Sequence, residues 1–354
     1  MTMVRKLAFL LVYTTIVAEA PTLSAEPETE KASVELEEII VTATRNRRSF
    51  GQQPTLVEVL NEEELNEKAN MKPGDIRMLL NETTGIHIQQ TSATSFNSSV
   101  RIQGLSGKYT QLLRDGMPMY GGLSSGLSLL QISPLDLQQV EVIKGANSTL
   151  YGGGAIAGLI NLVTKKPGAQ KEKSMLFNVT SAGGADASGY YSSRQGNWGT
   201  RIFGSYNQNS AYDPAENQFS AIPEFERLSF SPNIFYESSK REFSFGFNAV
   251  KEDRTGGDMD YIRGHRRHPA YFEQIETDRL STQTEYISQL DSGKEFVFRN
   301  SINSYQQAIN MMDYSFSGEQ ISSFSEAHIV GAAPRLDWVV GVNLWTENFE
   351  QKSI

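Results

Sequence analysis

The chain has 354 residues, a formal charge of −9 and no cysteine, and 39% of its residues are hydrophobic. The acidic balance argues against a nucleic-acid-binding protein, which needs a basic face. The lack of cysteine excludes disulfide bonds and thiolate metal sites within this sequence. No apolar run after residue 20 is long enough to form a membrane-spanning helix. Strands that cross a membrane escape this test, because they alternate apolar and polar residues.

The first 25 residues have the pattern of an export signal. Arg5 and Lys6 precede an apolar run at 7–18, and the small residues Ser24 and Ala25 follow. We expect a signal peptide over residues 1–25 that is cleaved after Ala25; a buried N-terminal helix is the alternative.

Residues 26–45 are predicted to be a flexible linker that contains one strand-like segment. The stretch before residue 37 is too poor in apolar residues to fold. The segment 37–45, "EEIIVTATR", is rich in β-branched residues that favour a strand. We expect this strand to be unpaired on a tether, with an ordinary first strand of the following domain as the alternative.

The stretch 46–166 is predicted to be an α+β domain. Acidic residues after Asn61 favour the start of a helix, and Pro73-Gly74 separates that helix from a second short one. Short strands are expected at 85–90, 99–105, 109–120, 137–145 and 158–166.

Residues 167–354 alternate with a period of two. In the segment 241–252, Phe243, Phe245 and Phe247 lie on one face, opposite Ser244, Gly246 and Asn248. An aromatic-rich apolar face opposite a polar face is typical of strands between lipid and water. A soluble β-sandwich, whose faces also alternate, is the alternative.

Nine strands are expected in this part of the chain. They lie near 174–181, 186–194, 198–208, 226–238, 241–252, 275–290, 295–308, 319–330 and 335–347. Connections are tight after the second, fourth, sixth and eighth strands and longer after the third, fifth and seventh, although the first is short. This alternation is expected of an outer-membrane barrel. Because such barrels have an even number of strands, we expect the barrel to be incomplete within this chain.

No pattern indicates catalysis. The P-loop-like "GLSGK" at 104–108 has the wrong spacing, and "GGGAIA" at 152–157 precedes an expected strand rather than a helix. No catalytic constellation can be assembled. We therefore predict that the chain is not an enzyme and needs no cofactor or metal.

One long connection is a candidate ligand contact. The stretch "RGHRRHPAY" brings together Arg263, His265, Arg266, Arg267 and His268. Its cations could bind an anionic ligand; a solvated charged loop is the alternative.

The specific signal is a resemblance over residues 100–122 and 132–166. These segments resemble the plug domain of TonB-dependent outer-membrane receptors. The matching positions are Asp115, Gly116, Pro118, Val140, Glu141, Val142, Lys144, Gly145, Leu150, Tyr151, Gly152, Ala155, Gly158, Ile160, Asn161, Thr164 and Lys165. Two positions depart from the family pattern: Gln103 stands where arginine is usual, and Ala146 stands where proline is usual.

The resemblance implies an α+β plug domain at 46–166, followed from residue 167 by the first part of an antiparallel transmembrane β-barrel. It implies export to the outer membrane of a Gram-negative cell. The strand-like segment then resembles the TonB box, which contacts the energising protein TonB by β-augmentation. The expected box residues are Glu38, Ile39, Ile40, Val41, Thr42 and Ala43.

The resemblance also implies active uptake of an extracellular small molecule. Plug apices at 91–99 and 119–128 would face outward, with Phe96, Tyr120 and Ser124 as candidate contacts. The family carries iron–siderophore complexes, haem, cobalamin and oligosaccharides, and we expect an iron chelate. A passive porin-like channel and a truncated, non-transporting fragment are the alternatives.

Overall fold

The residues that the computed structural model describes all lie within one compact unit of the chain, Ile39–Ile354. They are residues 40–41, 45, 48–49, 56–71, 74–92, 94, 98–119, 128–146, 151–265, 267–290, 293–333 and 336–353. The predicted signal peptide lies outside the described residues. Among the described residues, no helix is long and apolar enough to cross a membrane.

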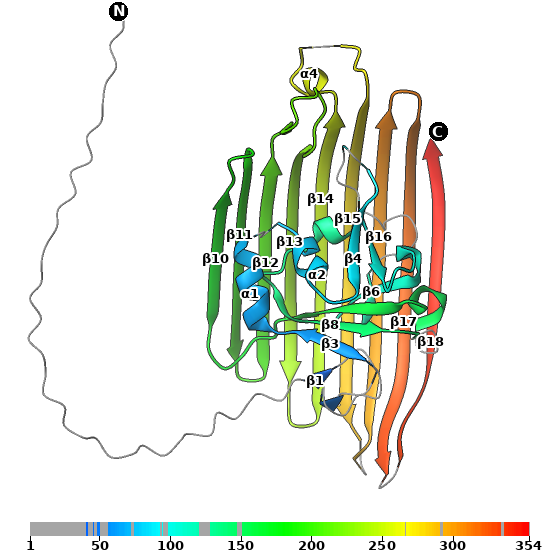
Figure 1. Ribbon diagram of the computed structural model, residues 1–354. Helices are drawn as coiled ribbons and strands as arrows, with labels where there is room; N and C mark the ends of the chain where they lie inside the picture. Colours follow the sequence, from blue (N-terminus) through cyan, green and yellow to red (C-terminus); the bar gives the residue numbers. More distant parts are fainter. Residues whose placement is uncertain are drawn as a thin grey trace, which may run out of the picture. The chain divides into compact units, whose positions relative to one another are not determined.

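The first half of the described chain forms a small α+β domain, here called the plug (Figure 1). Its strands form a five-stranded sheet in the order β3-β8-β9-β6-β7 and a separate hairpin of β4 and β5. The elements are β3 (Val57–Leu60), α1 (Glu62–Met71), α2 (Arg77–Asn81), β4 (Ile86–Gln90), β5 (Ser98–Ile102), η2 (Gly107–Tyr109), β6 (Thr110–Arg114), β7 (Met117–Pro118), η4 (Ser128–Gln131), β8 (Leu137–Lys144), η5 (Gly152–Ala155) and β9 (Gly158–Thr164). Both predicted helices and all five predicted strand segments are present.

Helix α1 begins where the sequence predicts, because Asn61 and Glu64 form a capping box. The backbone nitrogen of Glu64 donates to Oδ1 of Asn61 over 3.0 Å, and the nitrogen of Asn61 donates to Oε2 of Glu64 over 3.3 Å. These two bonds satisfy amides that have no partner within the first helical turn. Leu65 of α1 and Leu80 of α2 are buried and pack with Val140 of β8 in the plug core.

Strand β1 (Ile40–Val41) lies in the strand-like segment and has a partner. It pairs antiparallel with β2 (Arg48–Ser49), and these strands form a sheet of their own. The segment therefore differs from the expected unpaired strand, and it is not part of the plug sheet either. Residues 38, 39, 42 and 43 of the predicted box lie outside the described residues.

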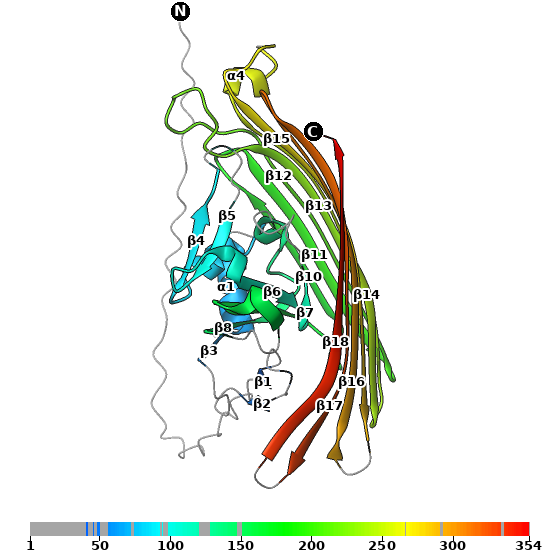
Figure 2. The same cartoon turned by 90° about the vertical axis from the view of Figure 1, so that its right-hand side faces the viewer.

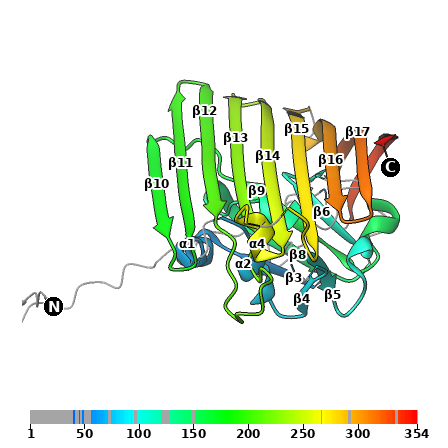
Figure 3. The same cartoon turned by 90° about the horizontal axis from the view of Figure 1, so that it is seen from above.

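The second half of the chain is a nine-stranded sheet, here called the wall (Figures 1 and 3). Each strand pairs antiparallel with the next in chain order, and β10 and β18 are the edges, so the described strands do not close a barrel. The strands are β10 (Glu172–Val179), β11 (Gly184–Gln195), β12 (Trp198–Asn209), β13 (Glu224–Glu237), β14 (Arg241–Gly257), β15 (Phe272–Gln289), β16 (Glu295–Met311), β17 (Ser315–Ala333) and β18 (Leu336–Ser353). The predicted nine strands are confirmed.

The two faces of the wall differ in polarity as the period of two predicts. On β13, Leu228 and Phe230 are 58% and 44% exposed, whereas Ser229 and Ser231 between and after them are 5% and 2% exposed. The apolar residues face outward, and the serines face the plug, which lies against the inner face (Figure 2). This is the arrangement of a strand with lipid on one side and polar protein on the other.

Connections at the two ends of the wall differ in length, with one correction. At one end, here called the turn end, they span only 196–197, 238–240, 290–294 and 334–335. At the other, the loop end, they span 180–183, 210–223, 258–271 and 312–314. The prediction of a long seventh connection is therefore wrong. Strands β16 and β17 continue pairing as far as Asn310 and Ser315, which leaves a tight turn between them.

Candidate functional site: the interface between plug and wall

Arg45 joins the segment after the predicted TonB box to both plug and wall. Its backbone has a φ of 68°, and its guanidinium group is buried. Nη2 lies 2.7 Å from Oε2 of Glu326 on β17, and Nη1 donates to the carbonyl of Gly116 over 2.8 Å. The group also lies over the ring of Tyr151, 4.4 Å from its centroid. One side chain thus contacts the wall and two parts of the plug.

The wall partner of Arg45 belongs to a larger charge cluster. Oε1 of Glu326 lies 3.1 Å from Nδ1 of His328 and 3.7 Å from Nη1 of Arg299. Arg299 in turn forms an ion pair with Glu285 on β15 at 2.7 Å. Two arginines and two glutamates balance each other in a buried site, where an unpaired charge is costly. Burial holds the pKa of Arg45 below its usual value, although the charge of Glu326 partly opposes this shift.

Tyr151 completes this contact from the plug side. It belongs to the segment that resembles the family pattern, and its ring is buried in the smaller plug core beside Leu113 and Leu159. Burial raises the pKa of its phenol. The face of the ring lies against the guanidinium group of Arg45, which is a cation–π contact.

Wall side chains hold the plug by its backbone. Arg227 of β13 donates to the carbonyl of Gly74 over 3.0 Å, and Gln283 of β15 donates to that of Arg114 over 3.2 Å. Arg201 of β12 donates to the carbonyl of Lys165 over 2.8 Å. Arg194 of β11 reaches the carbonyl of Pro167, just beyond the plug, over 3.1 Å. These four contacts use main-chain acceptors, whereas Ser92 with Glu273 and Lys165 with Glu172 are side-chain contacts between plug and wall.

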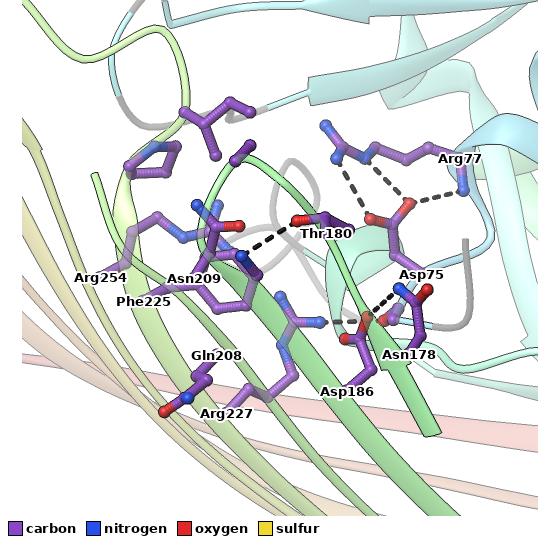
Figure 4. Close-up of a pocket in the computed structure, with 15 residues that line it drawn as sticks. Asp75, Arg77, Asn178, Thr180, Asp186, Gln208, Asn209, Phe225, Arg227 and Arg254 are labelled. Carbon is purple, nitrogen blue, oxygen red and sulfur yellow. Dashed lines mark hydrogen bonds and ion pairs between the residues drawn. The ribbon is translucent and has the colours of Figure 1, made fainter. Parts of the chain in front are cut away.

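A cavity of about 260 Å³ lies between α2 and strands β10–β14 near the loop end; we call it the wall cavity (Figure 4). Its lining includes Asp75, Arg77, Asp186, Phe225, Arg227 and Arg254. Arg77 forms two bonds with Asp75, at 3.1 Å each. Arg227 and Arg254 share Glu252, which lies behind them on β14. Because each cation in this lining is paired, the cavity has little net charge.

Residues that match the family pattern form a buried network inside the plug. The amide of Asn161 donates to Glu141 over 2.9 Å, and the backbone nitrogen of Gly116 donates to Asn161 over 2.9 Å. The hydroxyl of Thr164 donates to Asp115 over 2.9 Å. Asp115 and Gly116 have φ values of 50° and 75°, as a tight hairpin turn between β6 and β7 requires. These residues shape the plug rather than line a cavity.

The predicted ligand contacts are only partly described. Phe96, Tyr120, Ser124 and Arg266 lie outside the described residues. The other four candidates, Arg263, His265, Arg267 and His268, are exposed in the connection 258–271 at the loop end. In that connection the side chain of Asp258 caps α4 (Met259–Ile262). None of the four lines the wall cavity.

Sequence reasoning missed the residues that join plug and wall. Arg227, Arg254, Arg299 and Glu326 are charged residues at inward positions of alternating strands, where a charge needs a partner. Charged residues at the inward positions of the period-two pattern were therefore the sequence signal that could have indicated these contacts. By contrast, Gln103, one of the two departures from the family pattern, is exposed, so the missing cation leaves the described interface intact.

Two smaller predictions can be compared with the structure. The segment 152–157 leads through η5 into strand β9, which confirms that no nucleotide-binding helix follows the glycines. Among the described residues, no group of three or more histidine and carboxylate side chains could hold a metal ion.

Comparison with known families gives the identity of the plug. Residues 51–159 match the model described as TonB-dependent Receptor Plug Domain. Residues 51–159 are a plug domain of the TonB-dependent receptor family. Members of this family are receptors and transporters, so the match confirms the prediction that the chain is not an enzyme.

Similar receptors agree with that assignment. The chain is 30% identical over 152 residues to the ferric aerobactin receptor of Klebsiella pneumoniae, covering 43% of this chain and 20% of that receptor. It is 24% identical over 287 residues to the vitamin B12 transporter BtuB of Vibrio vulnificus, covering 78% and 43%. The pyoverdine outer membrane receptor FpvA from Pseudomonas aeruginosa, bound to pyoverdine, has a similar fold, with a TM-score of 0.70 and 16% identity over 88% of this chain and 49% of that one. The chain thus spans less than half the length of each receptor.

Proposed function

We propose that this protein takes part in TonB-dependent uptake of a scarce small molecule across the outer membrane, with a ferric siderophore or a similar iron chelate as the cargo. The observation that carries the proposal is Arg45. It lies two residues after the predicted box and is seated between Glu326 of the wall and Gly116 of the plug. A pull on the box would act directly on the contact that joins plug to wall.

The remaining support comes from the surfaces and the relatives. The outward apolar face of the wall suits outer-membrane lipid, and an exported protein of this kind needs the predicted signal peptide. Among the relatives, the aerobactin and pyoverdine receptors are named for siderophores, and a third is a vitamin B12 transporter. Iron chelates are therefore favoured, and a cobalamin is the second cargo class to test.

The proposal divides binding from transport, and a substitution in the predicted box separates the two. Val41→Pro removes a backbone N–H that pairing with a strand of TonB would need. Val41→Ala keeps that N–H and is the matched control. We expect the proline variant to bind cargo at the cell surface normally but to lose uptake, and the alanine variant to retain both.

The assay uses a strain without other iron and cobalamin receptors. Surface binding and uptake are measured with radiolabelled ferric aerobactin, ferric pyoverdine and cyanocobalamin as probes. Loss of surface binding in Val41→Pro would contradict the division of roles. Uptake that survives a protonophore would favour the passive channel, and recovery of the protein in the periplasmic fraction would favour the non-transporting fragment.

A further inference from the structure

On β11–β13, the wall residues that face the plug lie in cross-strand rows. These rows, here called levels, follow one another from the loop end to the turn end. The wall cavity includes Asp186 and Arg227, which occupy the level at the loop end. The next level consists of Ser188, Ser205 and Ser229, which are cross-strand neighbours. All three serines are buried, at 5% exposed each. A row of small hydroxyl side chains therefore lies next to the wall cavity, on the side toward the turn end.

Two of these serines make no hydrogen bond to the plug residues that the structure describes. Within the described part of the chain, the hydroxyls of Ser188 and Ser205 have no hydrogen-bond partner. The nearest wall-to-plug hydrogen bonds lie on either side of the row, from Arg227 to Gly74 and from Arg201 to Lys165. Buried hydroxyls normally have a hydrogen-bond partner. Because these two have none among the described residues, they can bond transiently to water or to a solute.

The row ends at an apolar contact between plug and wall. The level beyond the serines holds Tyr190 and Phe203, and Leu135 of the plug packs against both in one buried cluster. The level after that holds Ser192 and Arg201. Leu135 thus separates the serine row from the half of the wall near the turn end.

A second cavity, of about 240 Å³, lies near the turn end on strands β11, β13, β14 and β15. Its lining includes Lys166, Arg194, Phe235 and Ser244. Cavities with charged residues in their lining are thus present on both sides of the contact of Leu135 with Tyr190 and Phe203.

We propose that the solute passes between the plug and strands β11–β13, and that Leu135, seated on Tyr190 and Phe203, is the gate that closes this passage at rest. The inference rests on the proposed function, which it deepens by naming the route and the class of solute. The exposed lining of the wall cavity is mostly apolar, its charges are paired, and the serine row adds hydroxyl groups. Together these features suit a solute that has both polar and apolar surface and little net charge.

Single cysteines test the passage, because the 354-residue chain has none of its own. Ser205→Cys lies on the loop-end side of the gate and Ser192→Cys on the turn-end side. Ser301→Cys is the matched control, because Ser301 faces inward on β16, is 1% exposed and has a hydroxyl without a partner among the described residues. The probe is a charged, membrane-impermeant methanethiosulfonate added to intact cells.

We expect Ser205→Cys to react faster than both Ser192→Cys and Ser301→Cys. Adding Leu135→Ala should raise the reaction rate at Ser192→Cys by about tenfold, the factor expected when a buried contact of leucine size is lost. The rate at Ser301→Cys should not change. Leu80→Ala, in the plug core and outside the cluster of Leu135, controls for general loosening and should leave the ratio of the rates at Ser192→Cys and Ser301→Cys unchanged.

Equal reactivity of Ser205→Cys and Ser301→Cys would overturn the passage without any use of the gate variant. An equal rise at Ser192→Cys and Ser301→Cys in Leu135→Ala would overturn the gate. Neither readout depends on cargo uptake. If uptake depends on energy but the labelling differs from the expected pattern, only this inference is wrong. If the labelling is as expected but no uptake occurs, only the proposed function is wrong.

Discussion

Replacing Arg45 should release the segment that carries the predicted TonB box. Arg45→Met keeps much of the aliphatic stem but removes the ion pair to Glu326 and the hydrogen bond to Gly116. The donor of both contacts is the charged guanidinium group, and a hydrogen bond to a charged group contributes about 1.5–3 kcal/mol. Glu326 keeps Arg299 at 3.7 Å, which limits the cost of leaving its carboxylate behind. We expect docking of the segment to weaken by about 3 kcal/mol, or about 150-fold.

The measurement is the mobility of a nitroxide label attached to Val41→Cys. In the Arg45→Met background, the label should move faster than in the parent without any cargo present. Arg263→Met is the matched control, because Arg263 is exposed in the connection 258–271. An unchanged spectrum in a folded Arg45→Met protein would refute the reasoning, as would the same change in the control.

A double-mutant cycle sharpens the same prediction. Glu326→Gln leaves Arg45 buried without its carboxylate partner, so this change alone should also weaken docking. If the two side chains interact directly, the double variant should lose less than the sum of the single variants, by about 2 kcal/mol. Additive effects would mean that the ion pair does not couple the segment to the wall.

Three further substitutions test the plug and the wall. Asn161→Ala removes an amide that bridges Glu141 and Gly116, and should destabilise the plug by about 2–3 kcal/mol, measured as faster protease cleavage. Gly158→Ala should prevent folding, because φ is 145° and the new Cβ would lie 2.3 Å from the carbonyl of Ile143; Gly168→Ala, which meets nothing within 4 Å, should fold normally in heat-modifiable gel migration. Phe230→Arg on the outward face should destabilise the wall in the membrane by about 2–4 kcal/mol, whereas an arginine nearer the loop end should change this stability little.

The wall was predictable because its signal is local. Alternation on β13 and β14 depends only on neighbouring residues, and burial of one face fixes which residues point inward. The seventh connection was mispredicted for a related reason. The sequence between Ala308 and Glu319 resembles a loop. Only the pairing of β16 with β17 shows that the strands continue through most of it.

The candidate site was not predictable in the same way. Arg45 and Glu326 lie on different domains and far apart in the sequence, so nothing near either residue indicates the contact. The family pattern located Asp115, Asn161 and Thr164, but these residues turn out to fix the shape of the plug. The pattern therefore marked the part of the plug that must keep its shape.

The way in which the wall holds the plug has a consequence for sequence change. Arg227, Gln283 and Arg201 donate to the carbonyls of Gly74, Arg114 and Lys165, and every amino acid supplies a carbonyl. Substitutions of the side chains at these three plug positions can therefore leave the three hydrogen bonds intact as long as the backbone keeps its course. Receptors with this arrangement could change the side chains that meet a new cargo without having to redesign the fit between the two domains.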